Sequence, residues 1–369
     1  MRFLTADYLY PLYRMPIKEG ILQVSDKGKV VAIFEKRADV PKEELEIFNG
    51  ILCPGFVNAH CHLELSHLLG VVKKGKGFLN FIGAIQQRNN FTKDKILEKI
   101  EKAERQMIKN GIVAVGDICN TDDTLSQKQK GNLQYYNFIE IFGVQKKNIQ
   151  KTIKDGKLLR KQFRKNGFKT TLVPHAPYSV PPKLMREIAG NFDKKDLTLT
   201  IHNQEIKEEN ILFEQKSGAL FDWLQKTDAT SEIWEKRNKS TDILKELGNN
   251  KTLLVHNTFT KEEDLTNHYY CTCPKANLYI EKTLPDYSIL DADNLCVGTD
   301  SLASNNSLSI LEELQIIKEN SNFDLNTLLK IASKNGAEAL GFEKLGSFEK
   351  GKTPGVNLIS DLKKVKVIV

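Results

Sequence analysis

Several apolar runs of this chain end in a histidine or an acid of the kind that binds metal ions. The runs FVNAHCH, LTLTIHNQE, LLVHNTF and LCVGTDS place His60, His62, His202, His256 and Asp300 where a buried strand would give way to a loop. One such ending carries little information. Several in one chain predict a single metal centre, because the C-terminal ends of parallel barrel strands meet at one rim.

The middle of the chain alternates strand-like and helical patterns. Its apolar runs are continuous, which is typical of parallel strands covered on both sides. Helical patterns lie between them, such as residues 94–110 and 307–320. We expect eight strands, at 51–59, 111–119, 135–142, 170–175, 197–202, 252–256, 269–273 and 294–299. The pattern therefore predicts an α/β fold, a (β/α)8 TIM-type barrel whose chemistry lies at the C-terminal ends of its strands.

Both ends of the chain contain short strand-like runs instead. The run ILQVSDKGKVVAIF predicts a hairpin around Asp26-Lys27-Gly28. The last residues supply LGSFEKGKTPGVNLIS and VKVIV. We therefore expect a small β-sandwich domain built from residues 1–50 and 345–369, and a barrel domain over residues 51–344.

Charge and composition restrict the partners. The net charge is +7, and ten lysines and arginines lie between Lys146 and Lys169 against one acid, Asp155. Apolar residues recur among them at helical spacing, so the segment is interpreted as the exposed face of an outer helix and not as a nucleic-acid site. No apolar run approaches the roughly 20 residues that span a bilayer. We expect a cytoplasmic protein without nucleic-acid or membrane partners, whose six cysteines pack as free thiols.

The candidate ligands suggest a chemistry. His60 and His62 are two residues apart, so both side chains point to the same face of a strand. Three imidazoles with the carboxylate of Asp300 suit Zn²⁺, and also Fe²⁺. Glu205, three residues after His202, could move protons between an activated water and a substrate ring nitrogen. The alternative is that Glu205 is a surface acid at the start of a helix.

Two further histidines have open roles. His256 could hold the nucleophilic water, and His175, in the segment PHAPYS, could contact substrate. A structural role is the alternative for each. The connections 63–90 and 203–240 are long enough to cover the pocket, and Phe78 and Trp223 within them could stack on a planar ring or pack against the barrel.

The segment Pro54–Glu64 (PGFVNAHCHLE) resembles the opening motif of the amidohydrolase superfamily. The segments PHAPYS, His-x-x-Glu at 202–205, VHNTF, CPKAN and VGTDS match further blocks of that superfamily in the same order. Together they are similar to the mononuclear branch that contains cytosine, guanine, methylthioadenosine/S-adenosylhomocysteine and aminofutalosine deaminases, and the triazine chlorohydrolases.

The resemblance implies a role for each matched residue. It makes His60, His62, His202 and Asp300 the metal ligands, with Asp300 also accepting a proton from the water. Glu205 becomes the proton shuttle, His256 orients the water, and His175 touches the substrate. One divalent ion per chain is implied, because no lysine that could bridge two ions ends the fourth strand. Glu64 resembles the aminofutalosine deaminase and chlorohydrolase subgroups and is taken as a further substrate contact.

We therefore expect a metal-dependent hydrolytic deaminase of an aminated heterocycle, a purine nucleoside of aminofutalosine or adenosine type. A metal-bound hydroxide would attack the ring carbon, and ammonia would leave. One alternative is hydrolysis of a C–Cl or amide bond on the same fold. The other is a non-catalytic binding protein, which the intact Glu205 and Asp300 argue against. The substrate is a small molecule, and the oligomeric state is left open, with a homodimer as one option.

Overall fold

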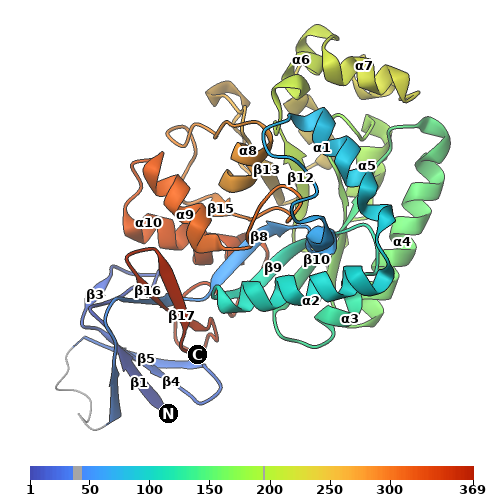
Figure 1. The fold of residues 1–369 in the computed structure, drawn as a ribbon. Coiled ribbons are helices and arrows are strands. Elements are labelled where there is room, and N and C mark those ends of the chain that lie inside the picture. Colours follow the sequence, from blue (N-terminus) through green and yellow to red (C-terminus); the bar gives the residue numbers. More distant parts are fainter. Residues whose placement is uncertain (36–43, 194–195) are drawn as a thin grey trace.

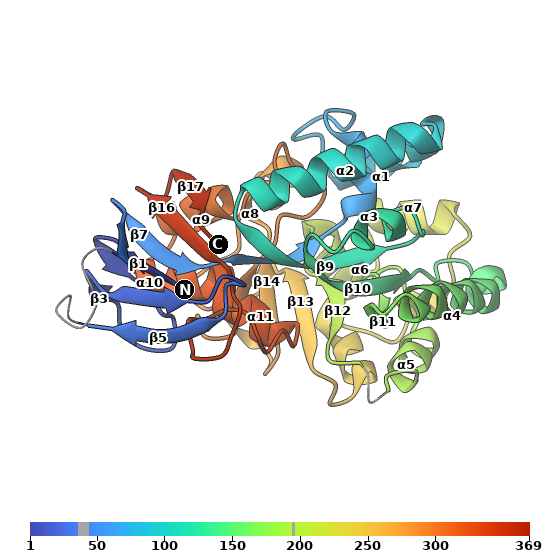
Figure 2. The same ribbon diagram turned by 90° about the horizontal axis from the view of Figure 1, so that it is seen from below.

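A parallel β-barrel forms the centre of the molecule (Figures 1 and 2). The computed structural model describes residues 1–35, 44–193 and 196–369. In that part of the chain the barrel strands pair as two parallel four-stranded sheets, in the orders β11-β10-β9-β8 and β12-β13-β14-β15. The expected (β/α)8 architecture is confirmed. Its strands are β8 (Phe56–Cys61), β9 (Ile112–Cys119), β10 (Gln134–Ile141), β11 (Lys169–Pro174), β12 (Leu199–Asn203), β13 (Thr252–His256), β14 (Tyr269–Thr272) and β15 (Leu295–Val297).

Backbone hydrogen bonds join the two sheets into a ring. The His202 N–H donates to the His175 carbonyl at 2.9 Å, which connects β12 to the end of β11. The Asp300 N–H donates to the His60 carbonyl at 3.1 Å, which connects the end of β15 to β8. Gly298 permits this second seam, because a Cβ there would lie 2.7 Å from the His60 oxygen. The barrel therefore closes at residues that the sequence marks as candidate ligands.

Helices cover the outside of the barrel (Figure 1). The basic segment forms α4, whose inward residues are Ile153, Gly156 and Phe163, so its lysines face outward as expected. No helix in the described ranges has the length and apolarity to cross a bilayer. The outer helices are α2 (Lys93–Lys109), α3 (Leu125–Lys128), α4 (Ile149–Lys165), α5 (Pro182–Gly190), α8 (Pro274–Ile280), α9 (Ile310–Glu319), α10 (Leu325–Leu329) and α11 (Asn335–Ala339).

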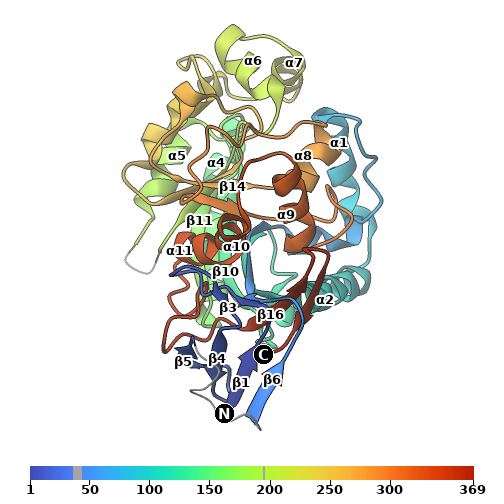
Figure 3. The same cartoon turned by 90° about the vertical axis from the view of Figure 1, so that its left-hand side faces the viewer.

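The two ends of the chain assemble a small β unit beside the barrel, and both termini lie there (Figures 1 and 3). Its sheets run β5-β4-β1-β6 and β17-β16-β7-β2-β3. Leu4 and Leu22 of the first sheet share one apolar core with Leu52 and Val356 of the second. The strands are β1 (Arg2–Thr5), β2 (Tyr8–Leu9), β3 (Ile17–Lys18), β4 (Ile21–Val24), β5 (Val30–Phe34), β6 (Leu45–Ile47), β7 (Ile51–Pro54), β16 (Val356–Ser360) and β17 (Lys364–Val367). The predicted hairpin is confirmed as the antiparallel pair β4 and β5.

The first expected barrel strand, 51–59, is wrong in its extent. Its first part is β7, which pairs with β2 and β16 in the small unit, and the barrel strand β8 begins only at Phe56. The chain passes between the two at Gly55, where a Cβ would lie 2.4 Å from Val113 Cγ1 and 2.7 Å from the Pro354 carbonyl oxygen. The domain limits at residues 50 and 345 stay a prediction, and positions 36–43 of that unit lie outside the described residues.

Three helices lie over the C-terminal rim of the barrel: α1 (Phe78–Ile85), α6 (Lys207–Gln215) and α7 (Ala219–Lys226). Figures 1 and 3 both place them on the side of the barrel away from the small β unit. They share an apolar cluster that includes Phe78, Tyr178, Phe213 and Leu220. The two long connections singled out in the sequence therefore cover the rim where the candidate ligands lie.

Candidate metal centre and active site

Three histidine side chains converge at the C-terminal rim. His60 is the last but one residue of β8, His62 follows the strand, and His202 comes from β12 on the other side of the barrel. The Nε2 atom of His62 lies 3.2 Å from Nε2 of His60 and 3.3 Å from Nε2 of His202. Ligand nitrogens about 2.0–2.1 Å from one tetrahedral zinc ion lie roughly 3.3 Å apart. The observed spacing fits three nitrogens aimed at one cation.

The protonation of these rings supports the same interpretation. His202 Nδ1 lies 2.9 Å from the His175 carbonyl, so Nδ1 carries the proton and Nε2 presents a lone pair to the other histidines. Burial lowers the pKa of His62 to about 3 and holds that of His202 well below its usual range. These imidazoles are therefore neutral, which is the form that binds metal. Lone pairs on Nε2 atoms this close repel one another, and a cation between them removes the repulsion.

Asp300 completes the cluster from the loop after β15. Its Oδ1 lies 3.4 Å from His62 Nε2 and 3.7 Å from His60 Nε2. Burial acts to raise the pKa of Asp300, but the close imidazoles of His60, His62 and His256 outweigh it and hold the pKa below its usual value. Ser304 Oγ donates to the other carboxylate oxygen. Asp300 has a left-handed backbone, with φ of 55°. Such strain concentrates at functional sites.

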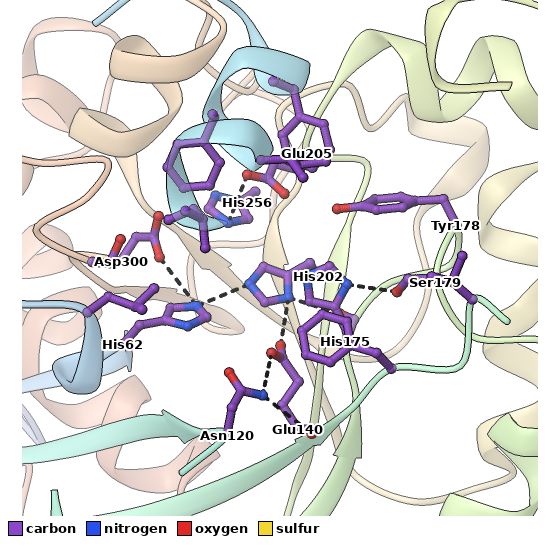
Figure 4. Close-up of a pocket in the computed structure, with 18 of the residues that line it drawn as sticks. His62, Asn120, Glu140, His175, Tyr178, Ser179, His202, Glu205, His256 and Asp300 are labelled. Carbon is purple, nitrogen blue, oxygen red and sulfur yellow. Dashed lines mark hydrogen bonds and ion pairs between the residues drawn. The ribbon is translucent and has the colours of Figure 1, made fainter. Parts of the chain in front are cut away.

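Glu205 and His256 face each other beside this cluster (Figure 4), with Glu205 Oε1 3.7 Å from His256 Nε2. Burial, with a smaller contribution from the charge of Asp300, raises the pKa of Glu205 well above its usual range. Burial therefore favours the protonated form of Glu205, from which a proton can be delivered into the cavity. The structure places it inside the site and not on the surface. The preceding Gln204 has a left-handed backbone, with φ of 45°, that turns the chain inward.

A contact behind His256 fixes its tautomer. His256 Nδ1 lies 2.8 Å from Asn277 Oδ1, so Nδ1 donates and Nε2 carries the lone pair. Nε2 is buried and has no hydrogen-bond partner within the described part of the chain. A buried acceptor without a partner costs about 1–3 kcal/mol, so His256 is prepared to receive a donor such as water. Asn277 belongs to the CPKAN segment, yet the sequence alone assigned it no role.

His62, His202, Glu205, His256 and Asp300 line a cavity of about 320 Å³, within the range of small-molecule sites. His175, Phe78 and Trp223 also line it, and their contact with substrate stays a prediction. His175 Nδ1 contacts Ser179 Oγ at 2.7 Å. The lining residues are His62, Leu65, Phe78, Phe81, Ile82, Ile85, Arg88, Asn120, Glu140, Phe142, Val144, His175, Tyr178, Ser179, His202, Glu205, Trp223, His256, Asp300 and Ser301.

Glu64 is not among the lining residues. Its Oε2 accepts hydrogen bonds from the N–H groups of Asn120 and Thr121 and from the Thr121 hydroxyl, each at 3.0 Å. Glu64 therefore faces the loop after β9 and ties that loop to the ligand-bearing strand. A direct substrate contact from Glu64 stays a prediction.

Glu140 is a pocket residue that the sequence did not reveal. It lies near the end of β10, and its side chain is 2% exposed. Burial raises its pKa to about 8. Within the run YYNFIEIF an isolated acid could face either side of the strand. The one feature of the sequence that pointed to a pocket residue was a polar side chain near the end of a buried strand. Asn120, just after β9, was missed for the same reason and contacts Glu140 Oε2 at 3.2 Å.

A TIM barrel that brings three histidines, an aspartate and a buried glutamate together at one rim defines a hydrolase with a candidate metal site. The chain belongs to the amidohydrolase family: the model of the "Amidohydrolase family" matches residues 51–368.

Individual relatives agree with this assignment. Adenosine deaminase from Helicobacter pylori is 27% identical over 358 residues, which cover 92% of this chain and 85% of that protein. Aminodeoxyfutalosine deaminase from Nitratiruptor sp. is 25% identical over 325 residues, covering 84% and 79%. The crystal structure of Helicobacter pylori aminofutalosine deaminase with methylthio-coformycin has a TM-score of 0.82 at 24% identity, covers 98% of this chain and 92% of that one, and shows the same fold. The family and the curated relatives identify a hydrolase that acts on C–N bonds.

Proposed function

We propose that this protein is a hydrolytic deaminase of an adenosine-like purine nucleoside, of the adenosine or aminofutalosine type. The observation that carries the proposal is the buried Glu205, which faces His256 beside the ligand cluster and whose pKa is raised by burial. Replacing a ring amino group by oxygen requires a proton donor for the ring nitrogen and an acceptor for the protons of water, and the cavity contains one of each. The names of the curated relatives support a substrate of this class.

The proposal includes one divalent ion per chain held by His60, His62, His202 and Asp300. The nitrogen-rich donor set suits Zn²⁺ best, with Fe²⁺ as the alternative. When bound, such an ion lowers the pKa of a water molecule toward about 7 and so supplies a nucleophile at neutral pH. A cytoplasmic location and a homodimer stay predictions from the sequence.

The residues of the chain divide the proton transfers. Asp300, ionised in the fold, accepts a proton from the attacking water, while His256 Nε2 accepts the hydrogen bond that orients this water. Glu205 gives its proton to the ring nitrogen next to the amino-bearing carbon as the C–O bond forms. A proton then passes to the amino group, the C–N bond breaks, and ammonia leaves. Water and substrate are consumed one to one, and no oxidant is needed.

Ammonia release from purified protein tests the proposal directly. We expect turnover with adenosine-type nucleosides, and less with free adenine, guanine, pterins, chlorotriazines and simple amides. Turnover of a chlorotriazine or an amide with no ammonia from any nucleoside would assign the protein to the alternative hydrolase class.

Glu205→Gln tests the proton carrier. The change keeps the size of the side chain, so the ion should stay bound while turnover falls by roughly 10²-fold or more, the usual contribution of a positioned acid–base group. Glu214→Gln, on the exposed face of the same helix region, is the matched control and should leave turnover unchanged. Near-normal turnover of Glu205→Gln at full metal content would refute the shuttle.

A further inference from the structure

Glu140 has no task in the proposed reaction, although it lies in the cavity. Tyr136, Phe138 and Glu140 alternate along one face of β10, and Tyr136 Oη contacts Thr171 Oγ1 of the neighbouring strand. The opposite face packs on the helices, because Ile141 Cδ1 lies against Gly156 of α4. Glu140 therefore points into the barrel at its C-terminal rim, the position from which barrel strands present groups to substrate.

One oxygen of this carboxylate has no hydrogen bond. Oε2 accepts from Asn120 Nδ2 at 3.2 Å, while Oε1 is buried and lacks a hydrogen-bond partner in the described ranges. His202 Nδ1 lies 3.5 Å from Oε1, but that atom already donates to the His175 carbonyl at 2.9 Å. A buried acceptor of this kind is costly unless a donor arrives.

The surroundings indicate where that donor comes from. Figure 4 shows Glu205 and Glu140 on opposite sides of His202 and His175. In the proposed reaction the ring nitrogen of the nucleoside lies next to Glu205. The opposite end of the nucleoside, which carries the sugar, then reaches Glu140. The ring of Phe142 lies 4.4 Å from that of His175, both in the cavity wall, so Glu140 receives its ligand beside apolar surface.

Resting on the proposed function, we propose that Glu140 and Asn120 form a subsite for the sugar hydroxyl groups of the nucleoside. Vicinal hydroxyls supply two neighbouring donors, which match a carboxylate oxygen without a partner beside an amide. A sugar that lacks both hydroxyls leaves the buried carboxylate unsatisfied, so the subsite makes the enzyme selective for ribosides over dideoxyribosides.

The test compares adenosine with 2′,3′-dideoxyadenosine, by ammonia release from metal-loaded protein. We expect the native protein to prefer adenosine by roughly 100-fold in kcat/KM. Glu140→Gln should reduce the preference below about tenfold, by raising KM for adenosine and leaving the dideoxy substrate and the metal content nearly unchanged. Glu104→Gln is the control. Glu104 is also a buried carboxylate, bound to Tyr135 Oη at 2.8 Å, but it does not line the cavity. This variant should keep the full preference.

Two outcomes overturn the subsite. Equal losses for both substrates together with lost metal would show that Glu140 only supports His202. No preference in the native protein would show that the sugar hydroxyls do not reach Glu140. If the protein shows no deamination, the subsite can still be tested without turnover, by measuring the affinities for inosine and 2′,3′-dideoxyinosine by calorimetry. Tighter binding of inosine that Glu140→Gln abolishes supports the subsite, whereas equal or absent binding refutes it.

Discussion

Glu313 provides a stability test that does not depend on the chemistry of the site. This carboxylate on α9 is fully buried, and it accepts hydrogen bonds from the Lys275 N–H at 2.8 Å and from Asn305 Nδ2 at 2.9 Å. Lys275 lies in α8, which also carries Asn277, the partner of His256, and Asn305 belongs to the loop after Asp300. Glu313 therefore connects two segments of the catalytic rim from behind.

The sign and size of its pH effect follow from burial. Burial raises the pKa of Glu313 from 4.5 to about 8, against the opposing hydrogen bonds. Below pH 4.5 both folded and unfolded chains hold the proton, whereas between about 4.5 and 8 only the folded chain retains it. Stability from this group is therefore lost as the pH rises through that window. At 1.36 kcal/mol per pH unit, the full window corresponds to roughly 5 kcal/mol, as an upper bound.

Glu313→Gln removes this dependence, because the amide does not titrate. Urea unfolding is followed by tryptophan fluorescence at pH 5 and at pH 8. Between these two pH values the free energy of unfolding of the native protein should fall by up to roughly 3 kcal/mol more than that of the variant. The pH dependence of metal binding is common to both proteins and cancels in the comparison. Glu312→Gln is the control: Glu312 is half-exposed and paired with Lys275, and its pKa is lowered. Parallel pH profiles for the native protein and Glu313→Gln would refute the argument, since they would show Glu313 ionised in the fold.

Two further predictions concern the ion and the cover of the pocket. Elemental analysis of protein purified without chelators should find one divalent ion per chain. Two ions per chain would overturn the mononuclear assignment. They would indicate that Glu140, His175 and His202, whose ligand atoms lie within 4.8 Å of one another, hold a second ion. Phe78→Ala and Trp223→Ala, made separately, should each raise KM several-fold at unchanged metal content, because both side chains line the cavity. A lowered Tm with KM unchanged would instead assign these rings to packing of the cover.

The sequence was sufficient for features that repeat along the chain. Eight apolar runs with helices between them predict the barrel, and histidines at the ends of several runs predict the ligand cluster. The division of 51–61 into β7 and β8 could not be found this way, because both parts are apolar and are separated by the pairing of β7 with β2 and with β16, some 300 residues away.

Side-chain direction limited the rest of the prediction. Glu64 and Glu140 are both acids in apolar surroundings, yet Glu64 is held by backbone N–H groups outside the cavity wall and Glu140 lines the cavity. Asn277 needed the position of His256 before its role was visible. Contacts between residues far apart in the sequence decide these cases, and no local pattern encodes them.

The seam at the His60 carbonyl also has a consequence for biosynthesis. The first two candidate ligands belong to β8 and its end, whereas Asp300 follows β15, the last barrel strand in the sequence. A chain growing on the ribosome therefore presents His60 and His62 long before their partners exist, beside a sheet edge still unpaired. Such edges attract other chains. We expect shortened translation products to be metal-free and bound by chaperones, so that metal uptake marks a chain whose synthesis has passed residue 300.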